Sequence, residues 1–172
     1  MPSLLKQSIV DALNRQVVEE FTAQNQYIAI ALYFDSETLP QLTRYFHLQA
    51  DEEHVHGMKL LQYITDAGGQ PVVPATREPK NQFSSVQEAV ELALNQELTV
   101  TEQINELVSL AARENDYLTR EILQWFVTEQ LEEVSTMTDL LNVVRRAGEN
   151  LFRIEDYLAQ NPRAAEAKPA EA

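Results

Sequence analysis

Residues 49–56, Gln-Ala-Asp-Glu-Glu-His-Val-His, decide how the rest of this chain is interpreted. The sequence around them repeats apolar side chains in alternating steps of four and three, which predicts a long helix with one face toward a core. Glu53 and His56 fall on that face, where residues three apart are neighbours. Asp51 and His54 have the same spacing but fall on another face, which we expect to be solvated. A buried ion pair or a hydrogen-bonded core histidine would give the same inward pattern, so the other helices must decide whether it binds a metal.

Three further segments of similar length also carry acids in the middle of an apolar stripe. The first helix, capped by Ser3, places Glu20 and Tyr27 inward. The third is capped by Ser84 or Ser85, with Glu88 placed to complete a capping box from Ser85, and has Glu97 as its one polar inward residue. The inward apolar residues expected in the fourth helix are Leu118, Ile122, Trp125, Phe126, Met137, Leu140 and Val144. Its middle carries Glu129, Gln130, Glu132 and Glu133.

The connections predict how these four helices are arranged. A short turn over residues 35–40 makes the first two antiparallel. Residues 68–83 have no periodicity, and a helix of about 28 residues is roughly 42 Å long, which some 15 extended residues can nearly span. This segment can therefore be a crossover that makes the second and third helices parallel. We expect an all-α four-helix bundle over residues 1–160, with a short fifth helix near its end and a disordered low-complexity tail over 161–172.

Composition limits the partners and the location. The chain has 172 residues, no cysteine, only four glycines and a formal net charge of -14. Without cysteine there is no disulfide, zinc ribbon or thiolate-bound iron, and without a basic footprint nucleic acid is not an expected partner. The negative charge makes cations the expected ligands. No stretch is apolar enough for a signal peptide or a membrane span, so we expect a cytoplasmic protein.

The inward acids point to metal binding. Four helices of equal length can be aligned so that their acids meet at one level, where unpaired carboxylates would cost several kcal/mol each. Arg15, Arg44 and Lys59 lie off the stripes and do not neutralise them. The positive charge must therefore come from outside. Carboxylates with one imidazole and no thiolate suit a two-metal site for iron or manganese.

In this order and spacing, the residues resemble the ferroxidase set of the ferritins, specifically the non-haem bacterial type. The resemblance covers about residues 1–160, including the crossover and the string Gln-Trp-Phe-Val-Thr-Glu-Gln at 124–130. It implies a first iron held by Glu20, Glu53 and His56, and a second by Glu53, Glu97 and Glu133, with Gln130 close by. It further implies a third iron site at Glu52, Glu129 and Glu132.

The function implied by the resemblance is iron storage. Fe(II) would be oxidised by O2 or H2O2 at the di-iron site and deposited as a ferric mineral inside a 24-subunit cage. Tyr27 matches the family tyrosine that hydrogen-bonds at this centre and can supply an electron, although simple hydrogen bonding to a carboxylate remains an alternative. The other functional alternative is a soluble di-iron oxidase or peroxidase that forms no cage.

Three departures from related proteins qualify the resemblance. The fourth helix lacks the second Glu-x-x-His of bacterioferritins, because Glu132 and Glu133 follow Glu129. His54 stands where bacterioferritins carry the haem-ligating Met, so no haem is expected. Arg120 and Leu123 replace the acidic pair of the three-fold channel in animal ferritins, so the resemblance does not identify the route by which iron enters. Trp125 is interpreted as core packing rather than as an electron carrier.

Overall fold

The structure is a computed structural model that describes residues 3–161, and in this range every regular element is a helix. The all-α prediction is confirmed. The helices are α1 (Gln7–Ser36), α2 (Pro40–Asp66), α3 (Val86–Arg113), α4 (Tyr117–Ala147) and α5 (Phe152–Gln160). None of these helices is long and apolar enough to cross a membrane. The tail predicted to be disordered, apart from Asn161, lies outside the described residues.

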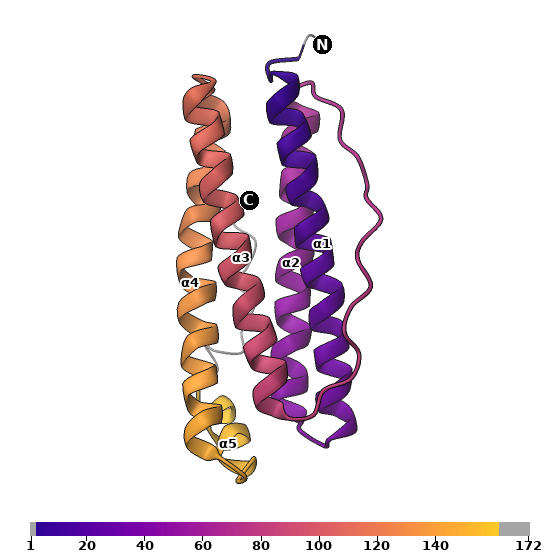
Figure 1. Cartoon of the computed structure of the whole chain (residues 1–172), viewed down its shortest axis with the longest axis vertical. Helices are drawn as coiled ribbons and strands as arrows, with labels where there is room; N and C mark the ends of the chain where they lie inside the picture. The colour runs from indigo at the N-terminus through magenta and orange to yellow at the C-terminus, as the bar shows by residue number, and fades with distance from the viewer. Residues whose placement is uncertain (1–2, 162–172) are drawn as a thin grey trace.

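The four long helices run side by side as two antiparallel pairs, α1 with α2 and α3 with α4 (Figure 1). The segment between α2 and α3 returns along the full length of α1, so α2 and α3 point the same way (Figure 1). The predicted crossover and the predicted parallel direction of the two helices are thus both confirmed. This topology brings the middle of every long helix to the same level of the bundle.

Side chains of α1 hold the crossover in place. The Asn14 side chain donates to the Gln70 carbonyl at 2.9 Å and accepts from the Val72 N–H at 2.8 Å. The Gln26 amide bonds both backbone groups of Lys80, at 2.9 and 2.8 Å. A long segment without its own secondary structure needs such partners for its backbone polar groups. The amides of α1 provide them at both ends of the crossover.

The predicted helix caps are partly correct. Ser85 accepts from the Glu88 N–H at 3.1 Å, as expected for an N-cap, but the Glu88 carboxylate bonds the Ser84 N–H rather than that of Ser85. Ser3 was the wrong cap for α1. Its hydroxyl accepts from the Leu5 N–H in a local turn, and the helix starts four residues later with Lys6 at the N-cap position and no side-chain cap.

The core-facing stripe of α4 begins one residue later than predicted. Leu118 is 55% exposed, whereas Thr119 is fully buried. The sequence misled because leucine is the more apolar residue, while the Thr119 hydroxyl is satisfied by Asp116 at 2.7 Å and lies 2.9 Å from the Tyr63 hydroxyl. The observed stripe, in steps of four and three, is Thr119, Leu123, Phe126, Gln130, Glu133, Met137, Leu140 and Val144.

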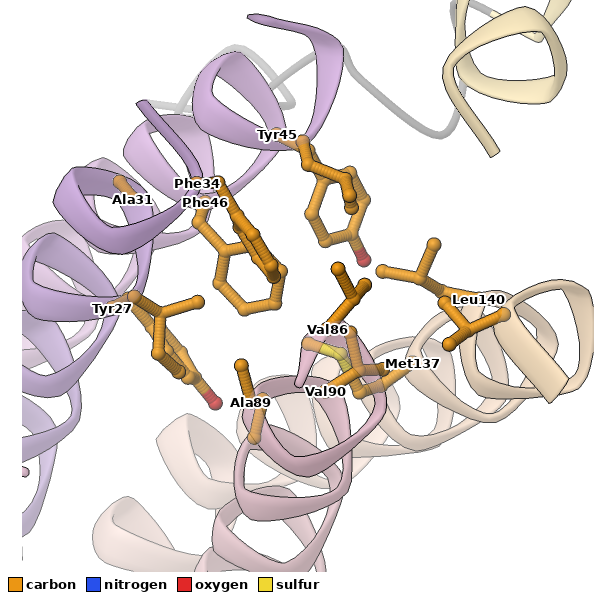
Figure 2. Packing of buried hydrophobic residues seen from close by; sticks show 14 of the residues in the cluster. Tyr27, Ala31, Phe34, Tyr45, Phe46, Val86, Ala89, Val90, Met137 and Leu140 are labelled. Atoms are coloured by element: carbon orange, nitrogen blue, oxygen red, sulfur yellow. The ribbon is translucent and has the colours of Figure 1, made fainter. Parts of the chain in front are cut away.

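The interior consists of two apolar clusters with a polar layer between them. One cluster is aromatic and includes Tyr27, Phe34, Tyr45 and Phe46, packed on the ends of α3 and α4 (Figure 2). The other is mainly aliphatic and fills the opposite end, with residues such as Ile9, Leu13, Leu60, Ile64 and Ile104. The clusters fix the register of the four helices, and therefore the level at which the polar side chains meet.

The short α5 closes the end of the bundle that holds the aromatic cluster. Ile154 and Leu158 are buried in that cluster. The Glu155 carboxylate accepts from the Gln41 and Leu42 N–H groups at 2.8 and 3.0 Å, in the first turn of α2. Because these N–H groups have no partner within their own helix, α5 acts as a side-chain cap for α2.

Candidate metal centre

Six polar side chains from all four long helices are buried in the layer between the two apolar clusters. Their exposed fractions are 1% for Glu20, 2% for Glu53, 3% for His56, 0% for Glu97, 2% for Gln130 and 8% for Glu133. The sequence predicted each of them as a site residue. Four carboxyl groups buried at this depth are energetically costly unless a cation or protons neutralise them.

A close approach of α1 and α2 places the first three of these residues together. A Cβ added to Gly57 would lie 2.6 Å from the Phe21 ring, so a larger residue would separate the two helices at this level. Glu20 and His56 are the immediate chain neighbours of this contact. The glycine in the middle of α2 thus has a packing role that brings α1 ligands within reach of α2 ligands.

Glu20, Glu53 and His56 form one compact ligand group. One candidate ligand atom from each lies within 4.8 Å of the other two. His56 Nδ1 is 3.3 Å from Glu53 Oε2 and 3.9 Å from Glu20 Oε2. The Oε2 atoms of Glu20 and Glu53 are buried and have no hydrogen-bond partner among residues 3–161. These two oxygens are therefore available to a cation.

A second ligand group combines His56 with Glu129 and Glu133 of α4, again with ligand atoms within 4.8 Å of one another. The imidazole belongs to both groups, so the two candidate metal positions are adjacent across α2 and α4. Glu129 is half-buried. Two neighbouring cation positions are the minimum requirement for a two-metal centre.

Glu97 is held by hydrogen bonds on the α3 side of the layer. The Tyr27 hydroxyl donates to one of its oxygens, and Gln130 Nε2 donates to the other at 3.4 Å. The Gln130 carbonyl oxygen accepts from the Thr101 hydroxyl at 2.8 Å, which turns the amide nitrogen toward Glu97. The carboxylate of Glu97 is thus positioned by two side chains, one from α1 and one from α4.

The electrostatics favour cation uptake. Burial raises the pKa of Glu20 to about 7, with further increases from the charges of Glu97 and Glu19. Burial also raises the pKa of Glu53 and Glu133 well above their ordinary value, and in both cases the charge of Glu97 is the next cause. The pKa of Glu97 is raised by burial as well. Without a cation, the layer therefore retains protons near neutral pH that a divalent ion would displace.

The comparisons with known proteins agree with this geometry. The ferritin-like domain family matches residues 10–147. Ferritin BfrB of Mycolicibacterium smegmatis is 48% identical over 154 residues, 90% of this chain and 85% of the relative. The bacterial non-heme ferritin of Staphylococcus epidermidis is 35% identical and covers 91% of this chain and 96% of its own. The chain belongs to the ferritin family.

A solved structure shows that the likeness extends to the fold. An open pore ferritin from the archaeon Archaeoglobus fulgidus superposes with a TM-score of 0.87 at 33% identity, covering 91% of this chain and 96% of the other. This confirms that the chain has the ferritin fold, a four-helix bundle with a short helix after it.

The remaining predicted ligands of this ferritin lie at the edge of the layer. Glu52 is half-buried and accepts a hydrogen bond from the Gln49 amide. Glu132 is exposed and lines a pocket that faces α5. Among residues 3–161, neither belongs to a group of three metal-binding side chains, whereas Glu129 does. The geometry thus separates Glu129 from the other two members of the predicted third site.

Several residues around the layer had no role in the sequence-based prediction. Gln16 donates to Glu20 Oε1 at 2.9 Å, and Thr101 orients Gln130 as described above. Gln16 could have been found, because it lies on the apolar stripe of α1 one turn before Glu20. Thr101 gave no such signal. Asp51 and His54 are exposed, which confirms that they lie off the core-facing stripe.

Trp125 contacts the centre without being buried in the core. Its ring lies edge-on to His56 with centroids 5.5 Å apart, and edge-on to Phe126 at 4.9 Å. The Lys59 ammonium group lies 4.2 Å above the ring centroid. The tryptophan therefore packs against a candidate ligand and helps to fix the orientation of the imidazole.

Proposed function

We propose that this ferritin stores iron by oxidising Fe(II) at the buried layer and depositing the ferric product inside a protein shell. The observation that carries the proposal is the pair of adjacent ligand groups that share His56, together with the buried Oε2 atoms of Glu20 and Glu53, which have no hydrogen-bond partner within residues 3–161. Hard oxygen ligands with one imidazole suit Fe(II) and Fe(III). Membership of the ferritin family favours iron over the other cations that such ligands bind.

Two Fe(II) ions would occupy the layer as substrates. The first binds Glu20, Glu53 and His56. The second binds Glu97 and Glu133 from the other side, with Glu129 within reach, and Glu53 bridges the two. In support of the bridge, the charges of Glu97, Glu20 and Glu133 all act on the pKa of Glu53 and raise it.

The chemistry requires electrons from two irons and a place for protons. Each Fe(II) gives one electron, so a pair reduces one H2O2 to two waters, or brings one O2 to the level of peroxide. Fe(II) binding displaces the carboxyl protons that the metal-free layer holds. The carboxylates then stabilise the higher charge of Fe(III) more than that of Fe(II), which favours oxidation.

Tyr27 and Gln130 would act beside the irons. The Tyr27 hydroxyl bonds a proposed iron ligand, so it is placed to supply an electron when O2 must be reduced beyond peroxide. Gln130 would hold Glu97 in orientation through its amide nitrogen. Glu52, Glu129 and Glu132, at the edge of the layer, would form a third iron site. No haem is proposed, and the purified protein should show no Soret band.

The exposed apolar surface and the family membership support the proposal of a shell. Large apolar side chains are exposed on α1 and on the crossover, including Ile28, Leu32, Val72 and Val73, with Val73 81% exposed. Ile28 and Leu32 lie one turn apart on the same face of α1, and exposed apolar side chains grouped on one face are typical of protein interfaces. We propose a 24-subunit cytoplasmic cage whose net negative charge attracts Fe(II). The alternative is a di-iron oxidase or peroxidase without a cage.

An Fe(II) titration of a sample of known particle size tests both the oxidation at the buried layer and the assembly into a shell. The protein is separated by size, titrated anaerobically with Fe(II), and then mixed with O2 while ferric absorbance is followed. We expect a particle of many subunits that binds at least two Fe(II) per subunit and oxidises them in a fast first phase. A small oligomer with fast oxidation would support the alternative. A large particle without a fast phase would remove the ferroxidase assignment.

A further inference from the structure

Lys59 of α2 lies against the ring of Trp125 on α4, at the edge of the metal layer. Its ammonium nitrogen is 4.2 Å from the centroid of the indole. Both side chains are half-buried, and within residues 3–161 no carboxylate forms an ion pair with Lys59. The chain has 27 acidic residues against 13 lysines and arginines. A shortage of acids therefore does not explain why this lysine contacts a ring.

The indole in turn contacts the proposed iron ligand His56. The two rings lie edge to face with centroids 5.5 Å apart, and Trp125 is the only tryptophan of the chain. Indole and phenol are the aromatic side chains that lose an electron most readily. Tyr27 belongs to the aromatic cluster and Trp125 packs on the aliphatic one. An oxidant formed in the layer thus has one such ring on each side.

The surroundings of the two rings have opposite effects on their oxidation. An ammonium group above an indole is attracted by the negative face of the neutral ring. Loss of an electron makes the indole positive, so the attraction becomes repulsion and Lys59 opposes the oxidation of Trp125. The Tyr27 hydroxyl instead donates to Glu97. The Glu97 carboxylate can accept the phenol proton as the electron leaves, so oxidised Tyr27 stays neutral.

We propose that Lys59 selects Tyr27 as the electron donor of the protein by hindering the oxidation of Trp125. Lys59 touches none of the reacting groups and acts through the indole. The source of the oxidant rests on the proposed ferroxidase function, whereas the effect of Lys59 on Trp125 is a property of the metal-free protein.

The electrons balance without a contribution from Trp125. Reduction of one O2 to two waters takes four electrons and four protons. Two Fe(II) ions supply two electrons, and a further Fe(II) supplies the fourth. Tyr27 supplies the third electron and releases its proton to Glu97.

Photoexcited riboflavin tests the effect of Lys59 without iron, because it is a neutral oxidant that takes one electron from an indole. The full chain is freed of metal and of oxygen, and the initial rate of tryptophanyl radical formation is followed by transient absorption. Lys59→Met and Lys59→Gln remove the charge, and Lys59→Arg keeps it. Arg44→Met, an exposed cation about 22 Å along α2, is the control for net charge. Acrylamide quenching of fluorescence reports how accessible the ring is.

Both neutral variants should form the tryptophanyl radical about 3- to 30-fold faster than wild type, the range that cation–π energies allow. Lys59→Arg and Arg44→Met should stay within about twofold of wild type, and acrylamide quenching should be the same in all proteins. Equal rates in wild type and the neutral variants would overturn the proposal. So would a faster rate that is matched by stronger acrylamide quenching, because the lysine would then only cover the ring.

The same proteins are then mixed with Fe(II) and O2, and radicals are trapped by rapid freezing. Wild type should show a tyrosyl signal, whereas Lys59→Met should show part of the radical on Trp125. A tryptophanyl signal of equal intensity in both proteins would also overturn the proposal. Absence of fast Fe(II) oxidation in every protein would instead refute the ferroxidase function, while the riboflavin rates would still decide whether Lys59 hinders the oxidation of Trp125.

Discussion

The aromatic cluster and the acidic layer occupy neighbouring levels of one bundle, yet they contribute to the protein in opposite ways. Phe34, Phe46 and Tyr27 pack tilted or edge-to-face, with ring centroids 5.4 and 5.8 Å apart, and gain stability from burial alone. One level away, Glu20, Glu53, Glu97 and Glu133 are also buried, but their carboxylates would repel one another when ionised. The cluster is complete as the chain folds, whereas the layer needs protons or cations.

This difference assigns a separate role to each region. The apolar clusters stabilise the fold and set the register of the helices, which brings the acids to one level. The buried acids lower the stability of the metal-free fold and, for the same reason, bind cations. Substitutions in the two regions should therefore separate folding from chemistry. The following predictions test that separation, beginning with the largest change in free energy.

Removing the Phe46 side chain tests the cluster. Phe46→Ala should lower the free energy of unfolding by about 3–5 kcal/mol, because a fully buried ring is replaced by a cavity. The measurement is denaturant unfolding of the metal-free protein. Glu53→Gln, two turns along the same helix, should change stability by less than about 1 kcal/mol, because burial raises the pKa of Glu53 and so favours the neutral carboxyl, which resembles an amide. Equal losses in both variants would contradict the separation.

Removing a ligand tests the layer. Glu53→Ala or His56→Ala should slow the fast phase of Fe(II) oxidation at least 100-fold, equivalent to about 2.7 kcal/mol, while the assembly remains folded. Stopped-flow absorbance and size-exclusion chromatography provide the two readouts. Asp51→Ala, an exposed acid on the same helix, is the matched control and should keep the wild-type rate. Wild-type rates in both ligand variants would refute the site assignment.

The pH dependence of stability tests the repulsion within the layer. The pKa of Glu20 is raised from 4.5 to about 7 by folding, so the folded state binds more protons between these values. Stability of the metal-free protein should fall as the pH rises from about 5 to 7, by up to about 1.4 kcal/mol per pH unit from this group.

Two comparisons isolate that contribution. Glu20→Gln should flatten the fall, because the amide does not titrate. Saturating Mn²⁺ should reverse it, because cations compete with protons for the same oxygens. The measurement is denaturant unfolding at fixed ionic strength across the pH range. A slope that is the same in wild type and Glu20→Gln would mean that Glu20 is not the source.

The smallest expected effect concerns Tyr27, which belongs to both regions. Its ring packs in the cluster and its hydroxyl donates to Glu97. Tyr27→Phe should keep Fe(II) binding and assembly, slow oxidation by a few-fold, roughly 1 kcal/mol, and abolish any tyrosyl radical trapped by rapid freezing. Tyr63→Phe, whose hydroxyl contacts Thr119 rather than the layer, is the control. Unchanged kinetics with the same radical would leave Tyr27 a packing residue.

The main features of the fold followed from periodicity. Steps of four and three identified the stripes of α1, α2 and α3, and the proline-containing stretch identified the crossover, because both depend on local chemistry. The phase of α4 was wrong at its start, since the burial of Thr119 depends on Asp116 and Tyr63 rather than on hydropathy. The cap of α1 was misplaced because the docking of residues 3–6 depends on tertiary contacts such as the Leu4 N–H to Ala67 carbonyl bond.

The candidate site was predictable where the acids interrupt a stripe. Glu97 is the clearest case, because it stands alone among apolar neighbours on α3. The residues that orient the ligands were harder to find, since Gln130 is held by Thr101 across a helix interface that only the folded chain defines. The pairing of Gly57 with Phe21 was equally invisible, although it brings Glu20 close to His56.

The most direct test of the two-metal layer is the position of iron itself. Crystals of the full chain are soaked anaerobically in Fe(II), and anomalous scattering is collected at the iron absorption edge. The account predicts two peaks in the buried layer of each subunit, about 3.5–4 Å apart, one beside Glu20 and His56 and one beside Glu97 and Glu133, with Glu53 between them. A single peak, or iron bound without contact to Glu53, would contradict it.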